Sequence, residues 1–189
     1  MSQTLSINTT LKSIFWSQEN SILRQALLVI FGVLVLAVSA QLSVPLKPVP
    51  LTFQSTAVIL IGMAYGARYG SIVVAAYLLA GLAGLPVLEG FGAGPAKFFG
   101  PTLGYLLGFF PAAMLSGYLA QKGWAKHVIT SFLAACLGVG IIFLCGTTVL
   151  AQSIGWYNAV FFGVLPFIVS EPIKLIVVAL LIPTLWKKV

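Results

Sequence analysis

The sequence predicts an all-α integral membrane protein, built as a bundle of six transmembrane helices in a single domain. Three observations lead to this class. Of the 189 residues, 60% are hydrophobic. Only 7% are charged, against about a quarter in soluble domains. The apolar residues come in six runs of membrane-spanning length, separated by short polar or Gly/Pro-rich joints.

Residues 1–20 are predicted to form an N-terminal tail that precedes the domain at 21–189. The tail is polar up to Phe15 and Trp16, and it lacks the apolar core and small-residue cleavage site of a signal peptide. Trp16 and Lys12 are residue types that rest at lipid headgroups. We therefore expect an interfacial or disordered tail.

The first three spans are expected at 21–42, 51–65 and 71–86. The first contains no proline and reaches about 33 Å, which is enough for the hydrocarbon core of a bilayer. Three prolines within 45–50 disfavour helix and favour an extended connection to the second span. The second span is short and has polar residues in its first turns, so this end of the helix is suited to something polar.

The loop at 85–101 is the most unusual connection. Four glycines and three prolines make it irregular, yet Phe91, Phe98 and Phe99 make it too apolar for a solvated linker. We expect this loop to fold down over another part of the protein.

The remaining spans are expected at 102–120, 128–150 and 158–185, the last interrupted by Pro166 and Pro172. Basic residues predict the orientation, because short cytoplasmic loops are rich in Lys and Arg. With a cytoplasmic N-terminus, seven basic residues fall inside and two outside, so both termini are predicted to be cytoplasmic. The inner set is Lys12, Arg24, Arg68, Lys122, Lys126, Lys187 and Lys188, and the outer set is Lys47 and Lys97.

Composition argues against several functional classes. The basic residues, which give a net charge of +7, are scattered rather than clustered as nucleic-acid binding requires. Cys136 and Cys145 lie nine residues apart in one span and His127 is the only histidine, so no metal or cofactor is expected. The chain has no Asp, no G-x-S-x-G elbow and no phosphate-binding P-loop motif. We therefore expect no enzyme.

Glu171 and Lys174 stand out because a charged side chain inside a span costs at least about 3 kcal/mol unless it is paired or faces water or ligand. They are three residues apart, which places them on the same face of a helix. One interpretation is a mutual ion pair that holds the sixth span in place. The other is that one or both bind a polar substrate, helped by Pro172, which frees backbone groups nearby.

The loops after the first and third spans lie on the same outer side and add further candidates. Gln54 offers an amide, and Glu89 is the only acidic residue in a loop between spans. Gly92 and Gly94 expose backbone groups that a ligand can approach. Together these groups suit a small molecule with a carboxylate and an amide-like head. Simpler interpretations stay open: a solvated charge for Glu89 and plain turns for the glycines.

Three ordered motifs resemble the signature segments of the BioY family. They are VPLKPVPLTFQS at 44–55, GLAGLPV at 81–87 with its glycine-rich sequel, and GPTLGYLLGF at 100–109. Members of this family are the biotin-specific substrate-binding subunits, or S-components, of energy-coupling factor transporters. The resemblance covers nearly the whole chain. It implies a six-helix S-component fold in a bacterial cell membrane, which captures biotin at its outward end.

The resemblance also implies partners and residue roles. The partners are a transmembrane coupling subunit and two cytoplasmic ATPases. The family's acidic residue and lysine in the last span fall on Glu171 and Lys174. Lys174 is then predicted to bind the carboxylate of biotin, while Glu171 and Gln54 suit its ureido ring. Phe91 or Tyr105 would provide an apolar wall for its thiophane ring.

The sequence departs from the family at three points. The acidic residue of the last span is usually Asp rather than Glu171. The family more often has a small residue in place of Glu89, so its contact with ligand is inferred from chemistry. The Ala-x-x-x-Ala pattern that S-components often use to meet the coupling subunit is absent from 21–42. The docking surface stays open: the row of Gly62, Gly66 and Gly70 is one candidate, but packing within the bundle is the favoured interpretation of this row.

Two other classes of function stay open at this point. A self-sufficient transporter driven by an ion gradient would accumulate its substrate without ATPase partners. A membrane assembly protein without a ligand would use the Glu171–Lys174 pair only as a packing device.

Overall fold

The computed structural model describes residues 22–186, and the described chain begins with helix α2 (Ile22–Gln41). The predicted tail at 1–20 lies outside these residues. Helix α2 contains no proline. Only 17% of its most apolar stretch of 18 residues is buried inside the protein. It packs mainly against α3, and its other faces carry exposed aliphatic side chains that suit lipid. The first predicted span agrees with α2 to within one residue at each end.

The proline-rich segment after α2 forms a short antiparallel hairpin. Strand β1 (Ser43–Val44) pairs with strand β2 (Leu51–Thr52), so that Ser43 lies opposite Thr52. The Lys47–Pro48 peptide bond between them is cis. The extended connection is confirmed, but the next helix starts at Gln54 rather than at residue 51. Because β2 ends outside a helix, the carbonyl of Thr52 has no intrahelical partner and is available to a side chain.

Helix α3 (Gln54–Leu82) consists of two helical arms that meet at Gly66, whose φ of 79° and ψ of 171° are not helical. The chain folds back there, because a Cβ placed on Gly70 would lie 2.9 Å from the Cα of Gly62. In a straight helix these residues would be about 12 Å apart along the axis. The predicted joint between the second and third spans therefore falls within one assigned helix. Gly62 also contacts the backbone of Ala113, so this glycine row is used for packing inside the bundle.

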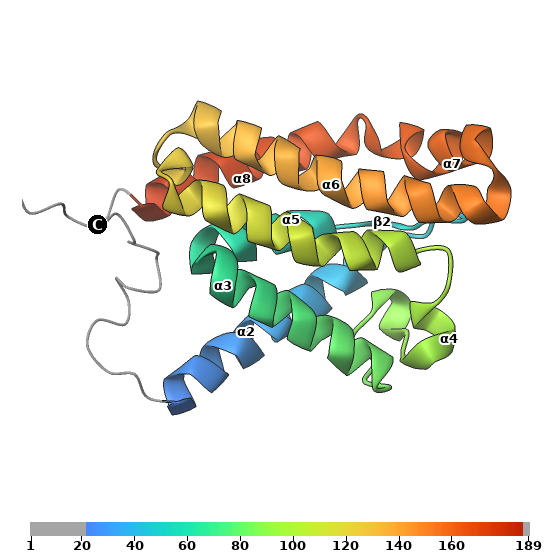
Figure 1. Cartoon of the computed structure of the whole chain (residues 1–189), viewed down its shortest axis with the longest axis horizontal. Coiled ribbons are helices and arrows are strands. Elements are labelled where there is room, and N and C mark those ends of the chain that lie inside the picture. The colour runs from blue at the N-terminus through green and yellow to red at the C-terminus, as the bar shows by residue number, and fades with distance from the viewer. Residues whose placement is uncertain (1–21, 187–189) are drawn as a thin grey trace, which may run out of the picture.

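The loop after α3 folds back onto the protein as expected. It contains the 3-10 turn η1 (Glu89–Phe91) and the short helix α4 (Gly94–Phe98), at the lower right of Figure 1. Leu88 anchors it: the side chain is 2% exposed and touches the position of a Cβ on Gly81.

Helices α5 (Leu103–Gln121) and α6 (Val128–Ile154) are joined by the 3-10 turn η2 (Trp124–Lys126). Helix α5 lies between α3 and α6 and has the most contacts with both (Figure 1). Glycine lets the backbones approach: a Cβ on Gly104 would lie 2.6 Å from the carbonyl oxygen of Cys145. The fourth and fifth predicted spans agree with these helices, although α6 continues four residues further than 150.

The last predicted span is broken into α7 (Trp156–Gly163), the turn η3 (Leu165–Phe167) and α8 (Ser170–Trp186), with a bend of 47°. The expected interruption at Pro166 is confirmed. The expected loosening at Pro172 is wrong, because Pro172 lies in the first turn of α8. Proline fits there without losing a hydrogen bond, since the first N–H groups of a helix have no intrahelical acceptor.

By length and composition, four helices of the described chain can cross a membrane, or five if the bent pair formed by α7 and α8 is one span. The count differs from the six predicted spans because α3 is assigned as one helix of 29 residues. The protein is an all-helical, multi-pass membrane protein. Its fully buried core gathers side chains from α2, α3 and α8, including Leu36, Val58, Ile59, Met63, Val73, Tyr77, Val178 and Ile182.

Candidate ligand-binding site

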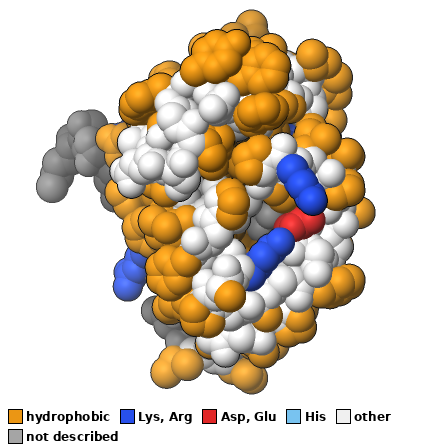
Figure 2. Space-filling model, turned by 90° about the vertical axis from the view of Figure 1, so that its right-hand side faces the viewer, with side chains coloured by type: hydrophobic (Ala, Val, Ile, Leu, Met, Phe, Trp, Pro, Cys, Tyr) orange, Lys and Arg blue, Asp and Glu red, His pale blue; other side chains and the backbone are white. Residues whose placement is uncertain are grey.

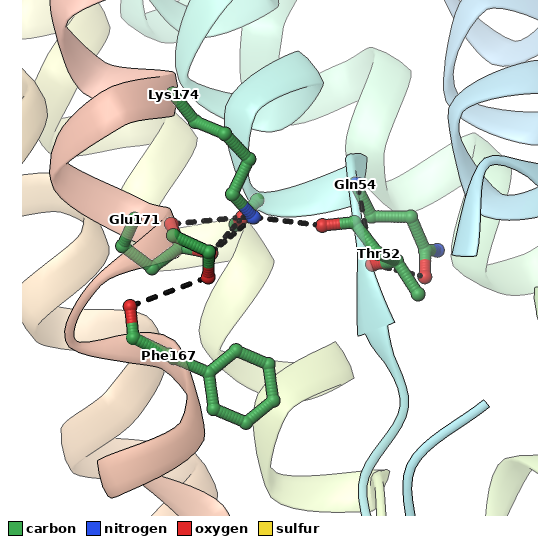
Figure 3. Close-up of polar contacts among 7 residues, drawn as sticks. Thr52, Gln54, Phe167, Glu171 and Lys174 are labelled. Carbon is green, nitrogen blue, oxygen red and sulfur yellow. Dashed lines mark hydrogen bonds and ion pairs between the residues drawn. The ribbon is translucent and has the colours of Figure 1, made fainter. Parts of the chain in front are cut away.

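Glu171 and Lys174 form an ion pair in the first turns of α8. Both are buried, with 6% and 5% of their surface exposed. The helical spacing of three residues brings the two charges together, as the sequence predicts. Figure 3 shows the Lys174 ammonium between the Glu171 carboxylate and the Thr52 carbonyl.

The start of α3 supplies the remaining partners of this ion pair. Lys174 Nζ donates to the Thr52 carbonyl at 2.8 Å and to Ser55 Oγ at 3.3 Å. Ser55 Oγ in turn donates to Glu171, with both carboxylate oxygens at 3.1 Å. Each buried charge therefore has hydrogen-bond partners, which offset part of the large cost of removing the charges from water. This network fixes α8 against the β2–α3 junction.

Gln54 begins a second network that reaches the loop after α3. Its Nε2 donates to the Tyr77 hydroxyl at 2.6 Å, and that hydroxyl donates to the Val87 carbonyl at 2.9 Å. Thr52 Oγ1 donates to Gln54 Oε1 at 3.3 Å. The amide of Gln54 is thus held in one orientation beside the buried ion pair.

A second ion pair lies within the loop itself, between Glu89 and Lys97, at 2.8 Å. It is much more open to solvent, with 41% of the Lys97 side chain and 19% of the Glu89 side chain exposed. On the face of the molecule in Figure 2, most of the charged side chains lie close together, with apolar side chains and white atoms around them.

One cavity connects the two networks. Its volume is about 60 Å³, and four of the predicted site residues line it: Gln54, Glu89, Tyr105 and Glu171. Apolar and polar side chains from the β1–β2 hairpin, α3, the loop after it, α5, α6 and η3 complete the wall. They are Val49, Pro50, Thr52, Ser55, Leu88, Lys97, Thr102, Leu106, Phe109, Ile142, Phe143 and Phe167.

Tyr105 presents its ring to the cavity while its hydroxyl joins α5 to α7. The hydroxyl donates to the Gly163 carbonyl at 2.9 Å. The ring meets Phe143 edge-on at 6.0 Å between centroids, and Phe143 meets Phe167 at 5.3 Å. These three rings form an apolar wall that suits a small hydrocarbon or thioether ring.

The other predicted site residues lie behind or beside the wall. Lys174 reaches the cavity only through Glu171, Ser55 and Thr52. The carbonyl of Gly92 accepts from the Leu88 N–H at 3.1 Å, and a Cβ at Gly92 would meet the Lys97 side chain. Gly94 starts α4 with a φ of 76°. Both glycines therefore have clear turn roles.

Four polar residues of the wall were not among the predicted site residues: Thr52, Ser55, Lys97 and Thr102. Lys97 counted only toward orientation, and Thr52 and Ser55 were seen as a polar helix end without individual roles. The signal for Lys97 was present, since it and Glu89 are the only charged residues of the loop at 85–101. Phe91, which the sequence suggested as a possible apolar wall, instead points outward, with 69% of its surface exposed.

The arrangement suits binding rather than catalysis. The cavity has aromatic and aliphatic walls between a buried pair of charges and a solvent-accessible pair, so it matches a small molecule that is polar at both ends and apolar between. Among residues 22–186 there is no cluster of three His, Cys, Asp or Glu that could hold a metal ion.

Comparisons with known proteins agree with this interpretation. The family model described as the BioY family matches residues 7–189. A biotin transporter BioY of Thermotoga maritima is 40% identical over 148 residues, covering 77% of this chain and 86% of the relative. A biotin transporter BioY2 of Lactococcus lactis is 32% identical over 169 residues, covering 86% and 90%.

A solved structure has the same fold. It is the crystal structure of the S-component for biotin from an ECF-type ABC transporter, with a TM-score of 0.80 and 26% sequence identity. The match covers 91% of this chain and 95% of that chain.

Proposed function

The chain belongs to the BioY family, and we propose that it is a biotin-capturing S-component of an energy-coupling factor transporter in a bacterial cell membrane. The observation that carries the proposal is the cavity, one wall of which is Glu171 from the buried Glu171–Lys174 pair inside a largely apolar bundle. A structural ion pair has no need of a cavity beside it, whereas a ligand site has.

The membrane arrangement of this proposal has six crossing segments with both termini on the cytoplasmic side. The reversal at Gly66 supports six, because it divides α3 into two arms that run in opposite directions. Gln121 at the end of α5 accepts a hydrogen bond from the Ala67 N–H at 3.3 Å. The reversal and the α5–α6 connection therefore share one end of the bundle, as their basic residues require for a cytoplasmic face. The cavity opens at the opposite end.

Biotin would lie in the cavity with its ureido ring toward the buried pair. The Glu171 carboxylate can accept from the ureido N–H groups, and the fixed amide of Gln54 can complete the polar contacts. The rings of Tyr105, Phe143 and Phe167 would cover the thiophane ring and the start of the valerate chain.

The contacts of the two lysines favour a different partner for the biotin carboxylate from the one predicted from the sequence. Lys174, the partner predicted from the sequence, already has three oxygen partners, so a second carboxylate would have to displace one of them. Lys97 has one carboxylate partner and a side chain that is 41% exposed. We therefore propose that Lys97 meets the carboxylate, while Lys174 holds the carboxylate of Glu171 in position for the ureido ring.

The energy for transport would come from partner subunits, since the sequence contains no P-loop. A transmembrane coupling subunit and two cytoplasmic ATPases are the proposed partners. Purified chain in liposomes should then bind biotin without accumulating it under an imposed proton or sodium gradient. Accumulation by the chain alone would instead favour a gradient-driven transporter.

The decisive experiment is isothermal titration of the purified chain in detergent with biotin, using dethiobiotin and thiamine as comparators. We expect one-to-one binding of biotin, weaker binding of dethiobiotin because it lacks the thiophane ring, and none of thiamine. Folded protein that binds none of the three would refute the proposal.

A further inference from the structure

Gln41, the last residue of α2, connects that helix to the loop between α3 and α5. Its Nε2 donates to the Leu88 carbonyl at 3.0 Å, and its Oε1 accepts from the Phe91 N–H at 3.0 Å. The same Nε2 donates to the Ala37 carbonyl in its own helix at 3.2 Å, which fixes the side chain's direction. A single amide thus holds both ends of the turn that contains Glu89.

That turn has an unfavourable backbone conformation. Gly90 has a φ of 64° and Phe91 a φ of 55°, and for Phe91 this left-handed conformation is strained. The Phe91 ring is 69% exposed, so side-chain packing does not hold it in place. The turn has two backbone bonds of 3.1 Å, between Leu88 and Gly92 and between Gly92 and Glu89, together with the buried Leu88 side chain and the Glu89–Lys97 ion pair. Loss of the Gln41 amide would remove the two hydrogen bonds that connect this strained turn to α2.

The turn forms part of the cavity wall. Leu88 and Glu89 line the cavity, and Glu89 pairs with Lys97, which lines it as well. Gln41 is not part of that lining, so any effect on ligand acts through these wall residues. Movement of the turn away from α2 would break both bonds to Gln41 and widen the opening of the cavity, so a bound ligand would leave more easily.

We propose that Gln41 is a positioning residue that holds residues 88–91 over the cavity and sets how long biotin stays bound. This inference rests on the proposed function, because it needs biotin as the ligand. It predicts a kinetic effect: removal of the amide speeds dissociation much more than it changes association, since the open wall does not obstruct entry.

The experiment compares Gln41→Met with the matched control Gln121→Met. Gln121 is also the last residue of its helix and also accepts from a distant backbone N–H, at the Gly66 reversal far from the cavity. Radiolabelled biotin is bound to each purified variant and chased with unlabelled biotin. We expect Gln41→Met to release biotin at least fivefold faster, with an association rate within twofold of wild type. Gln121→Met should leave both rates unchanged.

A second variant separates the two hydrogen bonds. Gln41→Glu keeps an acceptor for the Phe91 N–H but replaces the donor to the Leu88 carbonyl, so its dissociation rate should fall between wild type and Gln41→Met. Hydrogen exchange at the Phe91 amide should be fast in Gln41→Met and still slowed in Gln41→Glu. This variant also decides the matter if Gln41→Met does not fold.

Several results would overturn the inference. Wild-type dissociation rates in folded Gln41 variants would do so. So would an equal acceleration in Gln121→Met, because it would indicate general loosening of the bundle. If wild-type protein bound no biotin at all, the proposed function would fail first and this inference with it.

Discussion

The protein contains two Glu–Lys pairs that line or border one cavity. They have the same chemistry but differ in burial, in local structure and in their other hydrogen-bond partners. Glu171 and Lys174 are buried on a helix and share further hydrogen bonds with Thr52 and Ser55. Glu89 and Lys97 lie eight residues apart in an irregular loop and reach solvent. The comparison shows that burial separates the roles of the two pairs. The inner pair fixes α8 against the β2–α3 junction and presents a carboxylate to the cavity, while the exposed outer pair allows Lys97 to exchange Glu89 for a ligand carboxylate.

Magnitudes support this division. Removing one partner of a buried ion pair costs about 3–5 kcal/mol, because the other charge is left unpaired. Exposed pairs contribute about 0–1 kcal/mol and are screened by salt. Changes at the inner pair should therefore affect both stability and binding, and changes at the outer pair should affect binding alone.

Lys174→Met should give the largest effect. It leaves Glu171 as an unpaired buried carboxylate and removes the cation that holds this carboxylate in position for the ureido ring. We expect at least a tenfold loss of biotin affinity by titration, and a lower midpoint of thermal unfolding. Lys122→Met is the matched control, since Lys122 is exposed and its nearest partner is the ring of Tyr118. Unchanged biotin affinity in folded Lys174→Met would refute a role for the inner pair in the site.

The double variant Glu171→Gln with Lys174→Met should sharpen the same point. Each single change strands one buried charge, whereas the double change removes both. We expect the double variant to be more stable than either single variant, by thermal unfolding in detergent, while biotin binding stays lost. Additive destabilisation would show that the two side chains act independently despite their contact.

Lys97→Met should have a smaller and more selective effect. If Lys97 meets the biotin carboxylate, its removal weakens biotin by about three- to tenfold, in line with one exposed charge-assisted contact. Binding of biotin methyl ester, which has no carboxylate, should not change, and neither should the unfolding midpoint. An equal loss for acid and ester would mean that Lys97 shapes the loop rather than binding the carboxylate. The same ligand pair tested on Lys174→Met would then decide whether the carboxylate reaches Lys174, as predicted from the sequence.

The comparison also shows which features the sequence could predict. The inner pair was predictable because a spacing of three residues in a helix fixes the contact locally. Its partners Thr52 and Ser55 were not, because they lie more than a hundred residues away and depend on where α3 starts. The outer pair depends on an irregular loop, for which no periodicity exists. Pro172 misled because a proline breaks a helix interior but fits a first turn, and the sequence does not show which applies.

The fold was easier to predict from the sequence than the site, because it depends more on local features of the chain. Apolar runs and prolines predicted α2, α5 and α6 closely, since length in a bilayer constrains each of them singly. Gly66 sits in a joint that the sequence marked, but only its positive φ and the contact between Gly62 and Gly70 show that the chain reverses there.

Glu89→Gln should have the smallest effect, and its sign separates two interpretations of the outer pair. If Glu89 contacts biotin, as inferred from the sequence, the variant binds biotin less tightly. If Glu89 only competes with the biotin carboxylate for Lys97, the variant binds more tightly, by about two- to threefold at low salt. We expect the second result, because Glu89 already occupies Lys97 at 2.8 Å and its carboxylate would repel that of biotin. The gain should shrink in 0.5 M salt, where the screening length falls to about 4 Å. Titration of wild type and variant with biotin at both salt concentrations measures this change in affinity. A loss of affinity at low salt would mean that Glu89 contacts biotin directly.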